Sequence, residues 1–134
     1  MTQSFKIHSD ISVAETLPSS FYRDSKIFEK IRNDIFLKSW QFIGDDSQIK
    51  LNNSFMPYTI LDGFLTEPVI VTRDDESKVY CLTNVCTHRG NIIALGPGKS
   101  KKLTCCYHGR AFDLKGNFKS CLLYTSPSPR DTSS

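Results

Sequence analysis

The chain has 134 residues, of which 39% are hydrophobic, and a formal net charge of +3. This length supports one core but no second domain of any size, and nine Phe with five Tyr are typical of an ordered globular chain. The small charge excludes nucleic acid as a partner, since no basic run is interleaved with aromatics, and no apolar run is long enough to span a membrane.

Residues 1–39 are expected to form a polar arm followed by a helix. The first six residues lack the apolar core of a secretion signal, which favours a cytoplasmic protein, and His8 is expected to be solvated. The helix is predicted to begin after Asp24, acting as its N-cap. Four apolar residues then fall on one face at helical spacing: Ile27, Phe28, Ile31 and Ile35. We interpret this stripe as core packing.

From residue 40 the hydrophobic pattern changes to that of strands. Strands are predicted at 40–43, 55–61, 68–73 and 79–83, separated by polar turns, and a further hairpin at 111–118. Short strands joined by polar turns indicate a mainly β fold. We therefore predict a small antiparallel β-sandwich over residues 40–120, preceded by the N-terminal helical segment.

Two mixed pairs of cysteine and histidine interrupt this pattern. The first is Cys86 with His88 and the second is Cys105 with His108, with sixteen residues between the pairs. Two loops folded side by side would present two sulfurs to one metal and two nitrogens to another. A [2Fe-2S] cluster of the Rieske type needs this division, because two histidines replace two cysteines on one of its irons. All four residues are therefore predicted to be metal ligands that bind this cofactor.

A structural zinc site is the alternative that uses the same residue types. Tetrahedral Cys₂His₂ zinc sites usually pair cysteine with cysteine and histidine with histidine, whereas this chain has two mixed pairs. A structural zinc module without a redox role is therefore the less favoured interpretation.

The whole pattern resembles the Rieske iron–sulfur family. Arg89 and Gly90 follow the first histidine and Gly109 follows the second, as in that family, and the resemblance covers about residues 11–120. The segment before residue 44 is similar to the entry segment of the large subunit of Rieske non-haem iron oxygenases of the ring-hydroxylating type. The resemblance implies a Rieske fold with two cluster-binding hairpin loops, here 84–91 and 105–110.

The resemblance also implies partners for an oxidoreductase. Electrons in the oxygenase family pass from NAD(P)H through a reductase or a ferredoxin to the Rieske cluster, and then to a mononuclear iron that activates O₂. The full-length protein is expected to be a homo-oligomer. Neither the substrate nor the particular electron donor follows from the sequence.

Four positions in the ligand loops separate this chain from other members of the family. Respiratory members carry a disulfide over the cluster, whereas the matching residues here are Asn91 and Tyr107. Cys106 stands where oxygenases commonly have proline, and Arg110 stands where they usually have tryptophan. The respiratory subgroup is thereby excluded.

A second iron site cannot be assembled from this sequence. A non-haem Fe(II) site uses two histidines and one carboxylate, and once His88 and His108 are assigned to the cluster only His8 remains. The leading interpretation is therefore the electron-transfer part of an oxygenase whose catalytic domain is missing, with mononuclear Fe(II) expected only in that domain. Such a fragment is not expected to oxygenate substrate alone. A stand-alone Rieske ferredoxin is the alternative.

The last residues differ in composition from the rest. Residues 121–134 are rich in Ser and Pro, which predicts a disordered tail, and they resemble the translation of a sequencing-library adapter. We expect the natural sequence to end near Ser120. Three cysteines outside the ligand pairs, Cys81, Cys106 and Cys121, would be free thiols, which suits a reducing compartment.

Overall fold

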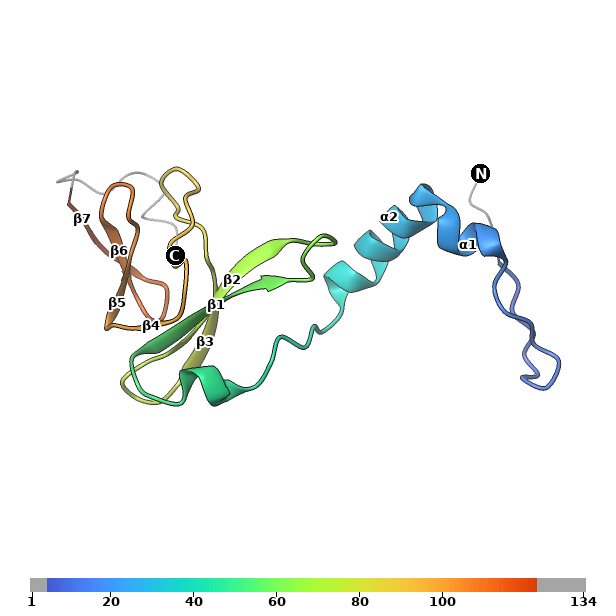
Figure 1. Ribbon diagram of the computed structural model, residues 1–134, viewed down its shortest axis with the longest axis horizontal. Helices are drawn as coiled ribbons and strands as arrows, with labels where there is room; N and C mark the ends of the chain where they lie inside the picture. Colours follow the sequence, from blue (N-terminus) through green and yellow to red (C-terminus); the bar gives the residue numbers. More distant parts are fainter. Residues whose placement is uncertain (1–4, 123–134) are drawn as a thin grey trace. The chain divides into compact units, whose positions relative to one another are not determined.

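The computed structural model describes residues 5–122. The chain divides into two compact units, Met1–Gln41 and Phe42–Ser134 (Figure 1). The predicted tail lies, from residue 123 onward, outside the described residues, and its resemblance to an adapter stays an expectation.

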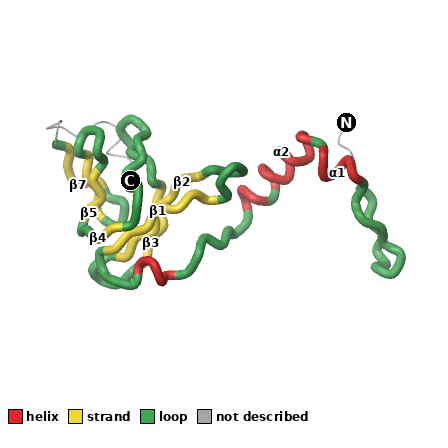
Figure 2. Tube along the Cα trace, in the orientation of Figure 1, coloured by secondary structure: helices red, strands yellow, loops and turns green. Residues whose placement is uncertain are grey.

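The first unit contains two short helices, α1 (Ser19–Arg23) and α2 (Ser25–Asp34), which pack against each other, and a 3₁₀ turn η1 (Phe36–Lys38) (Figure 2). The side chain of Asp24 accepts a hydrogen bond from the backbone N–H of Lys26 at 2.8 Å, so the predicted N-cap is confirmed.

The interpretation of the α2 stripe as core packing was wrong. No residue of α2 is buried, and Phe28 and Ile35 remain 48% and 55% exposed. Helical spacing predicted the helix correctly, but α1 has only five residues and cannot cover the apolar face of its neighbour.

The second unit consists of two antiparallel sheets, preceded by a 3₁₀ turn, η2 (Asp46–Ile49). One sheet has the strand order β3-β2-β1-β4, and its strands are β1 (Ser54–Ile60), β2 (Glu67–Arg73), β3 (Val79–Thr83) and β4 (Gly98–Lys99). The other has the order β5-β6-β7, with β5 (Lys102–Thr104), β6 (Arg110–Asp113) and β7 (Phe118–Cys121). The predicted fold class, mainly antiparallel β with a short helical segment before it, is confirmed (Figure 2).

Three of the predicted strands match β1, β2 and β3. The hairpin predicted at 111–118 matches the β6–β7 pair. The strand predicted at 40–43 was wrong: these residues form no strand, and Trp40 and Phe42 are almost completely exposed. Sequence analysis missed β4 and β5, which have only two and three residues. Cys121, assigned to the tail, is the last residue of β7 and pairs with Arg110.

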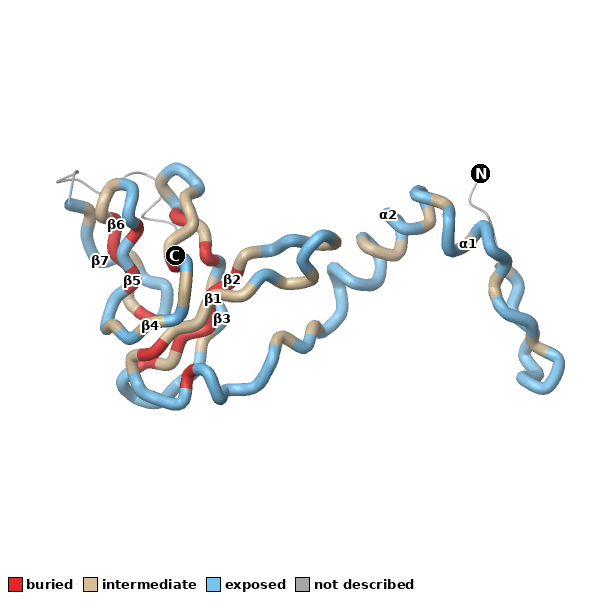
Figure 3. The backbone as a smooth tube through the Cα atoms, in the orientation of Figure 1, coloured by how far each residue is buried: buried red, intermediate tan, exposed pale blue. Residues whose placement is uncertain are grey.

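The core of the second unit lies among the strands and the loops that follow them, as the buried segments in Figure 3 show. Its buried members are Ile70, Cys86, Ala94, Leu103, Cys105, Phe112 and Leu114. Two of the four predicted ligands are thus part of the hydrophobic core. Among residues 5–122, no helix is long and apolar enough to cross a membrane.

Candidate metal centre

Both predicted ligand pairs lie in tight loops at the ends of strands. Loop 1 (residues 84–91) follows β3 and is closed by an isolated bridge between Val85 and Ile92. Loop 2 (residues 105–110) joins β5 to β6, which pair as an antiparallel hairpin. The sequence therefore placed both loops correctly.

The two loops share one backbone conformation. In loop 1 the N–H of Cys86 donates to the carbonyl of Asn91 at 2.7 Å, and the N–H of Gly90 donates to the carbonyl of Cys86 at 3.0 Å. In loop 2 the N–H of Cys105 donates to the carbonyl of Arg110 at 2.8 Å, and the N–H of Gly109 donates to the carbonyl of Cys105 at 3.0 Å.

A glycine in the left-handed region completes each of these turns. The φ angles of Gly90 and Gly109 are +71° and +70°, a conformation that side chains with a Cβ rarely adopt. Cysteine and glycine are four residues apart in both loops, although the histidine is the second residue after the cysteine in loop 1 and the third in loop 2. The same turn therefore presents a cysteine and a histidine twice.

The two cysteines meet inside the protein. Cys86 and Cys105 are 3% and 2% exposed, and their thiols are within hydrogen-bonding contact of each other. Burial raises the pKa of the Cys86 thiol. Burial alone would also raise the pKa of Cys105, but the backbone N–H groups of Tyr107 and His108, the Cys86 thiol and the Asn91 amide together hold it below its usual value. Of the two thiols, that of Cys105 is therefore the more acidic.

The two histidines meet closer to the surface. His88 and His108 are both half-buried, with ring centroids 4.8 Å apart and ring planes 66° apart. The Tyr107 ring lies against the His108 ring with centroids 3.8 Å apart, and it is 54% exposed. The imidazole pair is thus nearer to solvent than the thiol pair.

Two asparagines that sequence analysis did not select hold the loops in place. Asn84, 3% exposed, binds the backbone of Ala94 twice: its Nδ2 donates to the carbonyl and its Oδ1 accepts from the N–H, both at 2.8 Å. Asn91 reaches from loop 1 to loop 2, where its Nδ2 lies 3.7 Å from Sγ of Cys105 and 3.5 Å from Sγ of Cys106. A polar residue directly after a strand was the available sequence signal for Asn84.

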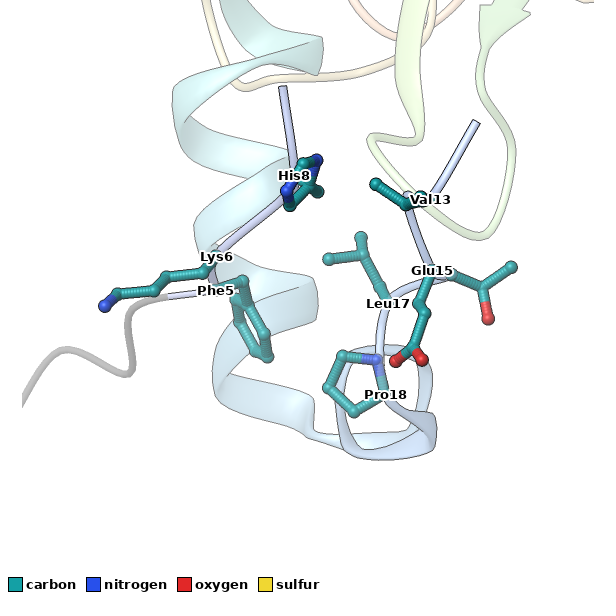
Figure 4. Close-up of a pocket in the computed structure, with 8 residues that line it drawn as sticks. Phe5, Lys6, His8, Val13, Glu15, Leu17 and Pro18 are labelled. Atoms are coloured by element: carbon teal, nitrogen blue, oxygen red, sulfur yellow. The ribbon is translucent and has the colours of Figure 1, made fainter. Parts of the chain in front are cut away.

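Three cysteines and His8 remain outside the two pairs, and of these Cys106 lies in loop 2 itself. Cys81 and Cys106 are exposed, while Cys121 is half-buried, with its Sγ 3.5 Å from the carbonyl oxygen of His108. His8 is exposed and belongs to the first unit, where it lines a hollow of about 590 Å³ (Figure 4). Glu15 is the one carboxylate among the residues given for that hollow.

The geometry is that of two pairs, one of sulfur and one of nitrogen donors. Within residues 5–122, no three His, Cys, Asp or Glu side chains gather at a single point suited to one metal ion. A tetrahedral zinc ion needs four donors around one centre, whereas a Rieske cluster takes two cysteines on one iron and two histidines on the other. The donor set and its division into pairs fit the cluster better than zinc.

Comparisons with known proteins identify the family. The family model of the Rieske [2Fe-2S] domain matches residues 39–125. The chloroplastic choline monooxygenase of Spinacia oleracea is 36% identical over 104 residues, which cover 78% of this chain and 23% of that protein. The carnitine monooxygenase oxygenase subunit of Escherichia coli (strain K12) is 34% identical over 105 residues, covering 78% of this chain and 27% of that subunit.

A solved structure supports the same relationship. The crystal structure of the quaternary ammonium Rieske monooxygenase CntA in complex with substrate L-carnitine matches with a TM-score of 0.69 and 31% identity, over 77% of this chain and 28% of that chain. The present chain thus spans about a quarter of the length of the curated relatives it matches.

Proposed function

Because the chain belongs to the family of Rieske [2Fe-2S] domains, we propose that it transfers single electrons through a [2Fe-2S] cluster held by Cys86, His88, Cys105 and His108. The observation that carries this proposal is the repeated loop, which brings two thiols together in the core and two imidazoles together nearer the surface. When bound, such a cluster supplies a reversible one-electron redox centre.

The residues of the chain have distinct tasks in this proposal. Cys86 and Cys105 bind one iron as thiolates, and the histidines bind the other through ring nitrogens. The backbone N–H of His88 donates to the Cys86 sulfur, and those of Tyr107 and His108 donate to the Cys105 sulfur. These donors stabilise negative charge on sulfur without admitting water, because both thiols are buried.

Anaerobic reconstitution of the 134-residue chain tests the proposal. About two irons and two sulfides per chain are expected, with the visible absorption of an iron–sulfur protein. Cys86→Ser and Cys105→Ser should each abolish incorporation, whereas Cys81→Ser, which changes an exposed thiol on β3, should retain it. One zinc ion and no sulfide per chain would show a structural zinc module instead.

The larger assembly is a finer part of the proposal. We infer that the chain is the electron-transfer part of an oxygenase, supported by its similarity to choline and carnitine monooxygenases and by the small share of their length that it spans. Its electron donor would be an NAD(P)H-dependent reductase or a ferredoxin, and the mononuclear Fe(II) would lie outside these 134 residues. A stand-alone ferredoxin remains the alternative. For either protein, the proposed location is the cytoplasm.

The oxygenase and ferredoxin alternatives are tested with the longer coding sequence and with the chain itself. A downstream segment with two histidines and a carboxylate is expected for the oxygenase. Given a reductase and NAD(P)H, the 134-residue chain should be reduced and then reoxidised by air without forming product. Stoichiometric product carrying oxygen from labelled O₂ would overturn this assignment, because it requires an iron with open coordination positions.

The similarity to choline and carnitine monooxygenases also favours one class of substrate for the full-length protein. Choline and carnitine are both quaternary ammonium compounds, and the matched structure is described as a quaternary ammonium monooxygenase. We extend the proposal accordingly: the full-length oxygenase oxidises a quaternary ammonium compound. Oxygen uptake by that protein with choline or carnitine, compared with an uncharged aromatic hydrocarbon, tests the class. Preference for the hydrocarbon would contradict it.

A further inference from the structure

Arg110 is a buried cation at the end of loop 2, and its side chain contacts loop 1. It is the first residue of β6, directly after Gly109, and is only 2% exposed. Its Nη1 donates to Oγ1 of Thr87, the residue between Cys86 and His88, at 3.1 Å. Its own carbonyl accepts the N–H of Cys105 at 2.8 Å. One residue therefore contacts both loops, through its side chain in loop 1 and its backbone in loop 2.

The guanidinium of Arg110 lies over an aromatic ring. Its central carbon lies 5.3 Å from the centroid of the Phe118 ring, on the neighbouring strand β7. A guanidinium is not deprotonated in proteins, and taking its charge out of water is costly unless specific partners stabilise it there. The Phe118 ring and the Thr87 hydroxyl are two such partners of the Arg110 guanidinium.

The charge of the proposed cluster determines what this cation does. Two ferric ions, two sulfides and two thiolates sum to zero, and the added electron makes the reduced centre negative by one unit. A fixed positive charge in the protein interior is poorly screened, so it stabilises the reduced form more than the oxidised form. Solvent-exposed charges act much less, because water and salt screen them.

We propose that Arg110 is a positioning residue of the cluster site whose buried positive charge raises the reduction potential of the centre while its side chain ties loop 1 to loop 2. This inference rests on the proposed function, because it needs the [2Fe-2S] centre to be present. It assigns a role to a charged side chain that is buried and hydrogen-bonded to loop 1.

The matched test compares Arg110→Gln with Arg89→Gln. Both remove one positive charge within two residues of a predicted ligand histidine, but Arg89 is exposed whereas Arg110 is buried. Voltammetry of the reconstituted chain should show a lower potential for Arg110→Gln by about 59 mV, which is a tenfold change in the ratio of reduced to oxidised centre. Arg89→Gln should change that ratio less than about twofold because its charge is screened.

Arg110→Lys separates charge from shape. It keeps the positive charge, so its potential should stay closer to that of the unsubstituted chain than to that of Arg110→Gln. If Arg110→Gln fails to incorporate iron, full incorporation by Arg110→Lys supports the requirement for charge, and failure of both variants overturns it. Equal potentials for Arg110→Gln and Arg89→Gln would also overturn it. The iron and sulfide content of the unsubstituted chain tests the cluster separately from these differences, and without a cluster there this inference falls too.

Discussion

At the scale of single residues, buried polar side chains hold the turns of this protein. Asp74, whose side chain is 4% exposed, begins the turn between β2 and β3. Its Oδ1 accepts from the N–H groups of Glu76 and Lys78, and its Oδ2 accepts from the Tyr80 hydroxyl at 3.2 Å, with Nζ of Lys115 at 3.5 Å. Burial would raise the pKa of Asp74, but these hydrogen bonds and the Lys115 charge hold it below its usual value.

The depressed pKa of Asp74 predicts a pH dependence of stability. The ionised carboxylate is favoured by the folded state, so its contribution is fully present above about pH 4, the ordinary range of an aspartate, and is lost as pH falls through the lower native pKa. Asp74→Asn should lower the free energy of unfolding near neutral pH. It should also make this free energy depend less on pH below about 4. Urea unfolding at a neutral and an acidic pH measures both effects.

The control for this experiment is Asp75→Asn, which changes an exposed carboxylate in the same turn. It should leave the dependence on pH close to that of the unsubstituted chain. The dependence should become weaker in Asp74→Asn without disappearing, because the pKa of Asp113 is also depressed, by hydrogen bonds from Asn117, Lys119 and Lys115 that outweigh burial. An identical profile for Asp74→Asn and the unsubstituted chain would show that the Asp74 contacts do not stabilise the folded state.

At the scale of elements, the edge strand β4 depends on one close contact. Gly98 of β4 pairs with Phe55 of β1, and the aromatic ring occupies the space that a side chain at Gly98 would need. A Cβ at this position would lie 3.0 Å from Cε2 and 3.1 Å from Cε1 of Phe55, and closer still to Cζ. The ring also packs against the core that contains both loop cysteines.

Gly98→Ala is therefore expected to destabilise the chain by about 1–3 kcal/mol, the usual cost of overpacking. Gly96→Ala is the matched control, since nothing lies within 4 Å of its added Cβ. The double variant Gly98→Ala with Phe55→Leu should recover part of the stability that Gly98→Ala loses, because the leucine side chain is smaller than the ring and can move away from the added Cβ. Chemical unfolding of the unsubstituted chain, of Gly98→Ala, of Phe55→Leu and of the double variant gives the coupling free energy between the two positions. Equal losses of stability in Gly98→Ala and Gly96→Ala would contradict the contact.

At the scale of the whole second unit, the two sheets are joined by a buried hydrogen bond as well as by apolar packing. Thr72 on β2 is completely buried, and its hydroxyl donates to the carbonyl of Leu114, just after β6, at 2.6 Å. Leu114 belongs to the same core as Cys86 and Cys105. The bond therefore connects the sheet that leads into loop 1 with the sheet that carries loop 2.

Thr72→Val keeps the shape of the side chain but removes the donor. Its expected cost is about 1–3 kcal/mol, because the buried carbonyl of Leu114 loses this partner. Iron should also leave the reconstituted variant faster in the presence of a chelator, since the two loops are carried by the two sheets. Thr59→Val, on the exposed part of β1, should alter stability by less than about 0.5 kcal/mol. If Thr72→Val and Thr59→Val release iron at the same rate, the hydrogen bond between the sheets does not help to hold the ligand loops in place.

The sequence by itself determined the positions of the two loops and the antiparallel β class of this protein, and it predicted the four ligands. These depend on local rules: cysteine, histidine and glycine at short separations specify a turn, and alternating side chains specify a strand. Tertiary structure decided which distant surfaces meet. Only there do Cys86 and Cys105 come into contact, does Arg110 place its charge beside loop 1, and do the residues of α2 prove not to be buried. Periodicity shows that a face is apolar, and residue type shows that a side chain is charged. Whether that face or that charge becomes buried depends on residues far away in the chain, and no local pattern contains this information.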